Sequence, residues 1–333
     1  MYPRLSDIFQ DLFGFSLPLP IYSFGAMLAV AFLVAAWLLR QELNRLYRVG
    51  RVGSVTVPVP DAKNSKKKRR ATQQASPAAL LNTVTIIAVV AGIIGSKLFH
   101  ILENLDQFSS DPLGMIFSTG GLTFYGGLIT AGLAIAYYLR KKEVSLLAFA
   151  DAVAPSLMIA YGIGRIGCYL AGDGDWGICS HLENKPNWLP TWLWTETFPR
   201  NIIGPGEQPI DVIQYNVGQG DVCAGADGVF PTMLYEFAMA AVLFGVLWAV
   251  RKHPFKSGWL FSLYLVFNGI ERFLIEQIRV NNEFFFLGMT VTQAEVISVL
   301  IILTGLIGLA LTTRKYIGDP AHDQPVEVSS AVV

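Results

Sequence analysis

Seven apolar runs, each long enough to cross a lipid bilayer as a helix, dominate this chain of 333 residues. A helix of about 20 apolar residues spans a hydrocarbon core of roughly 30 Å. The composition agrees, because 53% of the residues are hydrophobic and only 15% are charged. We therefore expect an all-α integral membrane protein of about seven transmembrane helices, with an external head inserted between spans four and five. The expected spans are Pro20–Leu39, Leu81–Leu102, Leu122–Leu139, Leu146–Leu170, Thr232–Val250, Trp259–Gln277 and Val291–Thr312.

Lysine and arginine gather in alternate connections between these runs. They cluster at 63–70, 140–142, 251–252 and 314–315. Because basic residues stay on the cytoplasmic side, we expect the amino terminus outside and the carboxy terminus inside. The first residues carry no small-residue cleavage pattern, so we expect no removed signal peptide.

This pattern divides the chain into six segments. Polar, basic or weakly apolar stretches separate the groups of spans and are expected to be solvated. The segments are 1–47 (amino-terminal segment and first span), 48–80 (basic, flexible cytoplasmic loop), 81–170 (spans two to four), 171–230 (external head), 231–315 (spans five to seven) and 316–333 (disordered cytoplasmic tail).

Charge and cysteine content narrow the classes of partner and cofactor. The formal net charge is zero, which gives no indication of a nucleic-acid partner. Three cysteines and four histidines occur without metal-ligand spacing, so we expect neither a metal site nor another cofactor. Cys179 and Cys223 both lie in the head, where an oxidising compartment would allow a disulfide.

Charged residues inside the expected spans indicate one functional layer. An ionisable group within a bilayer is costly unless it is paired or functional. Arg165 lies late in an outward-going span and Glu236 early in an inward-going span, so both are expected near the external face. Arg272, Glu276 and Arg279 follow at i, i+4 and i+7 on one face of the sixth span. An internal ion-pair network that fixes helix packing is the structural alternative, although burying charges is a poor way to stabilise packing alone.

Glycine-rich stretches flank two positions near the same boundary. The stretch GRIGCYLAGDGDWG at 164–177 places Arg165 between glycines, where a guanidinium suits a lipid phosphate. The stretch FYGGL at 124–128 places Tyr125 beside two glycines just below the surface. An interfacial aromatic residue and close helix packing are the alternatives here.

Four motifs together resemble the prolipoprotein diacylglyceryl transferases, a family of seven-span bacterial inner-membrane enzymes. GRIGCYLAGDGDWG, FYGGL, FPTMLYE at 230–236 and RFLIEQIR at 272–279 are similar to the family's GRxGNxxNxExxG, FHGGL, HPTQLYE and RFxxExxR. The resemblance covers about Pro20 to Lys315. It implies transfer of the diacylglyceryl group of phosphatidylglycerol to the lipobox cysteine thiol of a prolipoprotein, which forms a thioether and releases glycerol 1-phosphate. It also implies a periplasmic head and amino terminus and a cytoplasmic carboxy terminus.

The resemblance implies roles for individual residues. Arg165 and Arg272 match the family's two essential arginines and are expected to hold phosphate, while Glu276 is the hypothetical acceptor of the thiol proton. Tyr125 stands where the family has a histidine, which removes a histidine base from that place. Cys168 likewise replaces an asparagine. The expected catalytic residues are Arg165, Arg272, Glu276 and Tyr125, and the expected substrate-binding residues are Arg165, Arg272, Arg279, Tyr235, Glu236, Gly126, Gly127, Cys168, Asp173 and Gly177.

The expected partners are phosphatidylglycerol, a prolipoprotein signal peptide with its lipobox cysteine, and membrane lipid, with the chain a monomer. Two other functions compete with this one. A transporter or channel would place polar residues near the midplane or on inverted repeats, and the sequence shows neither. A catalytically inactive lipid-binding relative is suggested by the lost histidines and the enlarged head.

Overall fold

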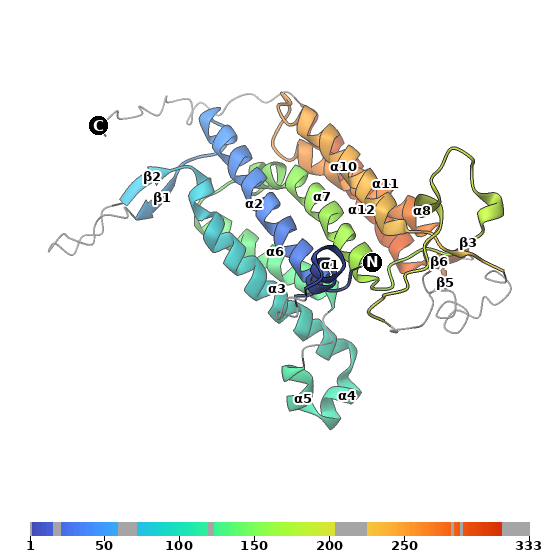
Figure 1. Cartoon of the computed structure of the whole chain (residues 1–333). Coiled ribbons are helices and arrows are strands. Elements are labelled where there is room, and N and C mark those ends of the chain that lie inside the picture. The colour runs from blue at the N-terminus through green and yellow to red at the C-terminus, as the bar shows by residue number, and fades with distance from the viewer. Residues whose placement is uncertain are drawn as a thin grey trace. The chain divides into compact units, whose positions relative to one another are not determined.

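The structure, a computed structural model, describes residues 2–15, 21–58, 72–118, 123–203, 225–280, 283–286 and 289–314. Figure 1 shows the helices and strands coloured by residue number. The described residues form two compact units. One contains the described residues up to Leu38 and from Val153 onward, and the other contains those from Leu39 to Ala152. Helices α2 (Ser23–Arg48) and α7 (Leu146–Ala171) each contribute residues to both units.

Among the described residues, five helices are long and apolar enough to cross a membrane, which confirms a helical, multi-pass membrane protein. They are α2, α3 (Leu81–Glu103, preceded by η2, Pro77–Leu80), α7, α10 (Thr232–Val250) and α12 (Gln293–Thr312). The other two expected spans are also helices, α6 (Phe124–Lys141) and α11 (Trp259–Glu276). Each has only 18 residues and carries charged residues in its last turns, so neither reaches the same length and apolarity.

The all-α prediction omits three antiparallel two-stranded ribbons. β1 (Val55–Pro58) pairs with β2 (Thr72–Ala75) inside the segment predicted as a flexible loop. β3 (Cys179–Ser180) pairs with β4 (Gly228–Val229), and β5 (Glu283–Phe286) pairs with β6 (Met289–Thr292). The β5–β6 ribbon delays the start of α12 to Gln293, and Thr292 then caps that helix.

Several predictions fall outside the described residues. These are the first residue of the Pro20 span, the Leu122 start of the third span, the basic cluster at 63–70, Cys223, Lys315 and the tail at 316–333. The first span is longer than expected, because α2 continues past Leu39 to Arg48 with Leu43 and Leu46 buried. A polar stretch that still buries one apolar face remains helical.

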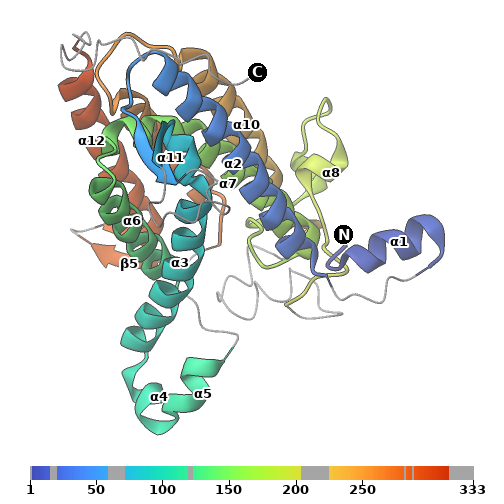
Figure 2. The same ribbon diagram turned by 90° about the vertical axis from the view of Figure 1, so that its left-hand side faces the viewer.

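The unit from Leu39 to Ala152 is built on α3 packed against α6 (Figure 2). Glycines make this approach close, since a Cβ on Gly126 would lie 2.4 Å from the Cβ of Phe99. A Cβ on Gly127 would lie 2.3 Å from the hydroxyl oxygen of Ser96. Beyond α3 come two short helices, α4 (Leu105–Ser110) and α5 (Pro112–Phe117).

In the other unit, α7, α10 and α11 share an apolar core that includes Met158, Leu247 and Leu260. α11 packs along α12, where a Cβ on Gly269 would lie 2.9 Å from the carbonyl oxygen of Ser298. The same unit contains the amino-terminal α1 (Leu5–Phe13).

The segment between α7 and α10, predicted as the head, has its own small core. Its described residues form β3, η3 (Leu182–Asn184), α8 (Thr191–Trp194) and β4. Cys179 is disulfide-bonded, whereas Cys168 is a free, buried cysteine. The buried residues of this core are Cys168, Trp176, Cys179, Phe198, Val229 and Met233.

Candidate active site

Four charged side chains, two on helices and two on the segments that follow helices, form a closed set of ion pairs, which we call the arginine ring. Arg165 on α7 contacts both Glu236 on α10, at 2.5 Å from Nε to Oε2, and Asp175. Arg279, just beyond α11, contacts Asp175 at 2.5 Å and Glu236 at 3.3 Å. Each carboxylate therefore bridges both guanidiniums. Glu236 is fully buried, whereas the side chain of Asp175 is 32% exposed.

The turn after α7 delivers Asp175 to the two arginines. Gly172 and Gly174 adopt φ angles of +63° and +95°, which favour glycine. The chain then forms a backbone bridge between Gly177 and Arg279. A Cβ on Gly177 would lie 2.6 Å from a backbone carbonyl oxygen, so this approach requires glycine. The glycines of this motif therefore allow the turn to reach the arginine ring, in addition to any close packing between helices.

Two residues that the sequence analysis did not select complete the buried network. Tyr161, one turn before Arg165 on α7, donates its hydroxyl to Glu236 Oε2 over 2.5 Å. The same hydroxyl lies 3.2 Å from Oε1 of Glu271, which is 2% exposed. The Arg165 guanidinium also stacks over the Tyr161 ring, at 5.0 Å from its centroid. The one sequence signal for a second buried acid on α11 is that Glu271 directly precedes Arg272 within an expected span.

Arg272 and Glu276 form a separate ion pair on α11, with 2.8 Å between Nη2 and Oε2. Their i, i+4 spacing was predicted and is observed. The Thr292 hydroxyl, at the start of α12, donates to Glu276 Oε1 over 2.6 Å. Nη1 of Arg272 is buried and has no hydrogen-bond partner among the described residues. Arg272 and Arg165, expected to act together, thus contact different carboxylates.

Comparison with known proteins assigns the family. The family model for prolipoprotein diacylglyceryl transferase matches residues 11–311. The chain belongs to this family. The phosphatidylglycerol–prolipoprotein diacylglyceryl transferase of Corynebacterium efficiens is 30% identical over 319 residues, which cover 94% of this chain and 83% of that protein. The protein of the same name from Clostridium tetani is 26% identical over 83% of this chain and 86% of its own length.

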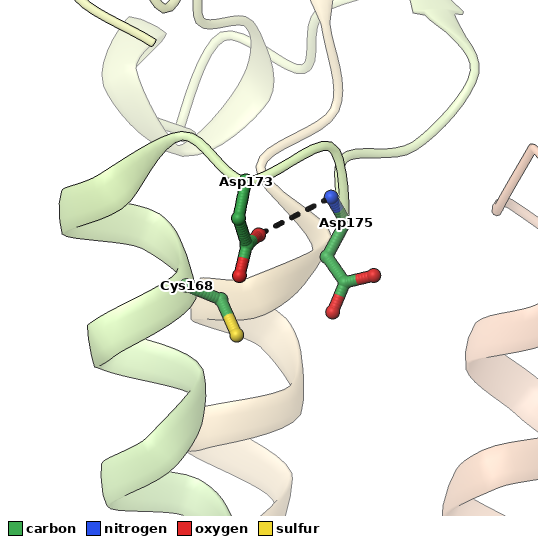
Figure 3. Close-up of side chains that lie close together, drawn as sticks. All are labelled: Cys168, Asp173 and Asp175. Atoms are coloured by element: carbon green, nitrogen blue, oxygen red, sulfur yellow. Dashed lines mark hydrogen bonds between the residues drawn. The ribbon is translucent and has the colours of Figure 1, made fainter. Parts of the chain in front are cut away.

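Membership in the prolipoprotein diacylglyceryl transferase family confirms the resemblance that the four motifs indicated. Within this family, the chain differs from the family's motifs at several positions. Cys168 is one of them. Its sulfur and the carboxylates of Asp173 and Asp175 lie within 4.8 Å of one another (Figure 3). Nη1 of Arg165 lies 3.8 Å from that sulfur.

The two aspartates of this turn differ in their electrostatics. Burial raises the pKa of Asp173, although a hydrogen bond from Cys168 opposes that shift. Burial also acts to raise the pKa of Asp175, but Arg279 and Arg165 outweigh it and hold that pKa below its ordinary value. Asp175 is therefore the acid that contacts the arginines, whereas Asp173, predicted to bind substrate, lies beside Cys168.

The remaining predicted residues make contacts of other kinds. The hydroxyl of Tyr235 donates to the carbonyl oxygen of Leu193 and so ties α10 to the head segment. Tyr125, Gly126 and Gly127 belong to the other unit, where the glycines pack against α3. Tyr125 is 40% exposed.

Proposed function

We propose that this chain transfers the diacylglyceryl group of phosphatidylglycerol to the lipobox cysteine thiol of a prolipoprotein, releasing glycerol 1-phosphate. The printed names of its relatives specify phosphatidylglycerol and prolipoprotein as their substrates. The observation that carries the proposal is the Arg272–Glu276 pair. The pair places a guanidinium N–H that has no hydrogen-bond partner among the described residues beside a buried carboxylate, the two groups that a phosphate ester and a thiol require.

Arg272 supplies the donor for the headgroup. Its side chain is 27% exposed and contacts one carboxylate within the described parts of the chain, so part of its planar fork remains for a phosphate oxygen. In a site without bulk water, such a donor also stabilises negative charge that grows on the departing oxygen. The hydrocarbon tails of the lipid stay within the bilayer.

Arg165 acts from the arginine ring. Of its two carboxylate partners, Asp175 is partly exposed and sits on a turn, whereas Glu236 is buried on α10. Phosphate therefore takes the place of Asp175, and Glu236 keeps the guanidinium in position. This exchange leaves no carboxylate buried without a partner, because Asp175 can turn toward water.

Glu276 accepts the proton of the attacking thiol. Its carboxylate is buried beside Arg272, with 2.8 Å between Oε2 and Nη2, so the proton acceptor stands next to the donor proposed for the headgroup. The sulfur forms a bond to the glycerol carbon that carries the phosphate ester, and the carbon–oxygen bond breaks. Its electron pair leaves on the oxygen of glycerol 1-phosphate, and the thiol proton remains on Glu276.

The proposed setting is the bacterial inner membrane, with seven spans, a periplasmic amino terminus and head, a cytoplasmic carboxy terminus and a monomeric chain. The alternation of basic connections supports this orientation. The disulfide at Cys179 suits a periplasmic head. Labelling of single cysteines from each side of sealed vesicles tests it, and a head labelled only from the cytoplasmic side would reverse it.

The decisive assay uses purified protein with phosphatidylglycerol and a lipobox peptide, with the thioether product measured by mass spectrometry. We expect product from the wild-type protein and a loss of about 100-fold or more in kcat for Glu276→Gln. The control is Arg140→Ala, which changes an exposed arginine at the end of α6 and should leave turnover unchanged. Lipid binding without product would indicate an inactive relative, and unchanged turnover in Glu276→Gln would reject the base.

A further inference from the structure

Tyr161 places one hydroxyl hydrogen between two buried carboxyl groups. Its oxygen lies 2.5 Å from Oε2 of Glu236 and 3.2 Å from Oε1 of Glu271. A phenol has a single O–H donor, so it satisfies only one of them at a time. If both carboxyl groups were ionised, the second would face a lone pair of the tyrosine oxygen. The geometry therefore requires one further proton.

Glu271 is the group that holds this proton. Glu236 contacts two guanidiniums, whereas Glu271 makes no ion pair within the described parts of the chain. Its second oxygen is buried and has no hydrogen-bond partner among those residues. An ionised carboxylate without a cation is strongly disfavoured in such a place, and the neutral acid is not.

The other surroundings of Glu271 are apolar. Glu271 lines a groove of about 340 Å³ between α10 and α11, whose remaining walls include Val242, Phe267, Ile270 and Leu274. Among the described residues, the charged or titratable groups that face Glu271 are Tyr161 and Arg165 from α7, Glu236 from α10, and Tyr264 and Arg272 from its own helix. Both arginines already pair with other carboxylates.

We propose that Glu271 is held as a neutral carboxylic acid whose O–H donates to Tyr161, so that Tyr161 donates to Glu236 and fixes it between Arg165 and Arg279. Glu271 is thus a positioning residue that acts through Tyr161 on the arginine ring. The inference rests on the proposed function only for its consequence on turnover. The protonation of Glu271 is a property of the resting protein.

A neutral Glu271 also sets the charge that an anionic headgroup meets. The two arginines and two carboxylates of the ring sum to zero, as do Arg272 and Glu276. An ionised Glu271 would make this region net negative and oppose the entry of a phosphate. Neutrality at Glu271 is therefore what leaves the guanidiniums available to an anion.

Infrared spectroscopy of the full chain in nanodiscs tests protonation without reference to activity. The spectrum of the wild type minus that of Glu271→Gln at pH 7 should contain the carbonyl band of one protonated carboxylic acid. The control is Glu103→Gln, which changes an exposed glutamate and should remove no such band. Absence of the band from the Glu271 difference, or a lost carboxylate band in its place, would overturn the proposal.

Turnover tests positioning. Glu271→Gln keeps a neutral donor toward Tyr161 and should remain within about twofold of the wild type in kcat. Glu271→Met and Tyr161→Phe break the chain of hydrogen bonds and should lower kcat about tenfold, with KM for the peptide unchanged. Equal losses in Glu271→Gln and Glu271→Met would overturn the positioning role. If the wild type forms no thioether, the proposed function fails, while the infrared result still decides the state of Glu271.

Discussion

The arginine ring and the Arg272–Glu276 pair lie in one unit of the molecule and use the same residue types. They differ in how many carboxylates each arginine contacts. Arg165 and Arg279 each contact two carboxylates, whereas Arg272 contacts one. A guanidinium that bridges two elements holds a fold together. Nη1 of Arg272 and Nε of Arg279 are both buried without a hydrogen-bond partner among the described residues. The side chain of Arg272 is 27% exposed and that of Arg279 only 10%, so Arg272 is the more open to a ligand. The comparison assigns the ring mainly to architecture and the pair mainly to substrate.

The largest effect is expected from breaking the ring. Arg165→Ala leaves the fully buried Glu236 and the turn of Asp175 with one arginine between them. We expect a loss of about 3 kcal/mol in unfolding free energy together with loss of turnover. Detergent titration of unfolding measures the first, with Arg140→Ala as the control. Stability equal to the wild type would show that the ring does not hold the helices.

Lysine substitutions separate the two regions more sharply. Arg272→Lys can keep one ion pair with Glu276 but loses the planar fork, so turnover should fall about 100-fold with little change in stability. A lysine at position 165 cannot bridge Glu236 and Asp175 as well as arginine does. Arg165→Lys should therefore lower both turnover and stability. Parallel thioether assays and unfolding titrations decide this. The same pattern in both variants would erase the distinction between ring and pair.

A smaller effect is expected at Thr292, which serves the pair indirectly. Its hydroxyl donates to Glu276 and also accepts the backbone N–H of Glu295 at the start of α12. Thr292→Val should cost about 1 kcal/mol in unfolding free energy, because it removes a helix cap. Thr292→Ser keeps the hydroxyl and is the matched control. A valine variant as stable as the serine variant would contradict this role.

The smallest expected effect is the acid dependence of the ring. The pKa of Asp175 is lower in the folded protein than in the unfolded chain, where an aspartate has a pKa of about 3.9. Its contribution to stability is therefore present at neutral pH and is lost as pH falls below that value. Asp173 has a raised pKa, so its ionised form lowers the stability of the folded protein at neutral pH. At pH 7, Asp173→Asn should therefore stabilise the folded protein, and Asp175→Asn should destabilise it. Melting temperatures of both variants between pH 7 and pH 3 provide the measurement.

Local sequence patterns predicted much of this fold. Thr232–Val250 is a helix with the predicted ends, and the fourth span differs from its prediction by one residue. The length of the apolar run predicts these helices, because a backbone in lipid must form its hydrogen bonds within the same segment. The extension of α2 to Arg48 coincides instead with the burial of Leu43 and Leu46, which lie in a stretch too polar to be predicted as part of a membrane span.

The candidate site was predictable only where its contacts are local. The Arg272–Glu276 pair follows from helical spacing, and it is observed. Glu271 and Tyr161 were missed because their contact joins two helices separated by more than 100 residues. The contact of Asp175 with the arginines could not be predicted from the sequence, because it depends on the path of the turn that carries Asp173 and Asp175.

The backbone bridge between Gly177 and Arg279 gives the turn after α7 a fixed length as well as a fixed sequence. One added residue between Gly172 and Gly177 would displace the chain by about 3.3 Å, enough to carry Asp175 out of contact with both guanidiniums. In this chain, whose turn is one residue longer than the family motif GRxGNxxNxExxG, an engineered insertion or deletion should therefore separate Asp175 from the two arginines.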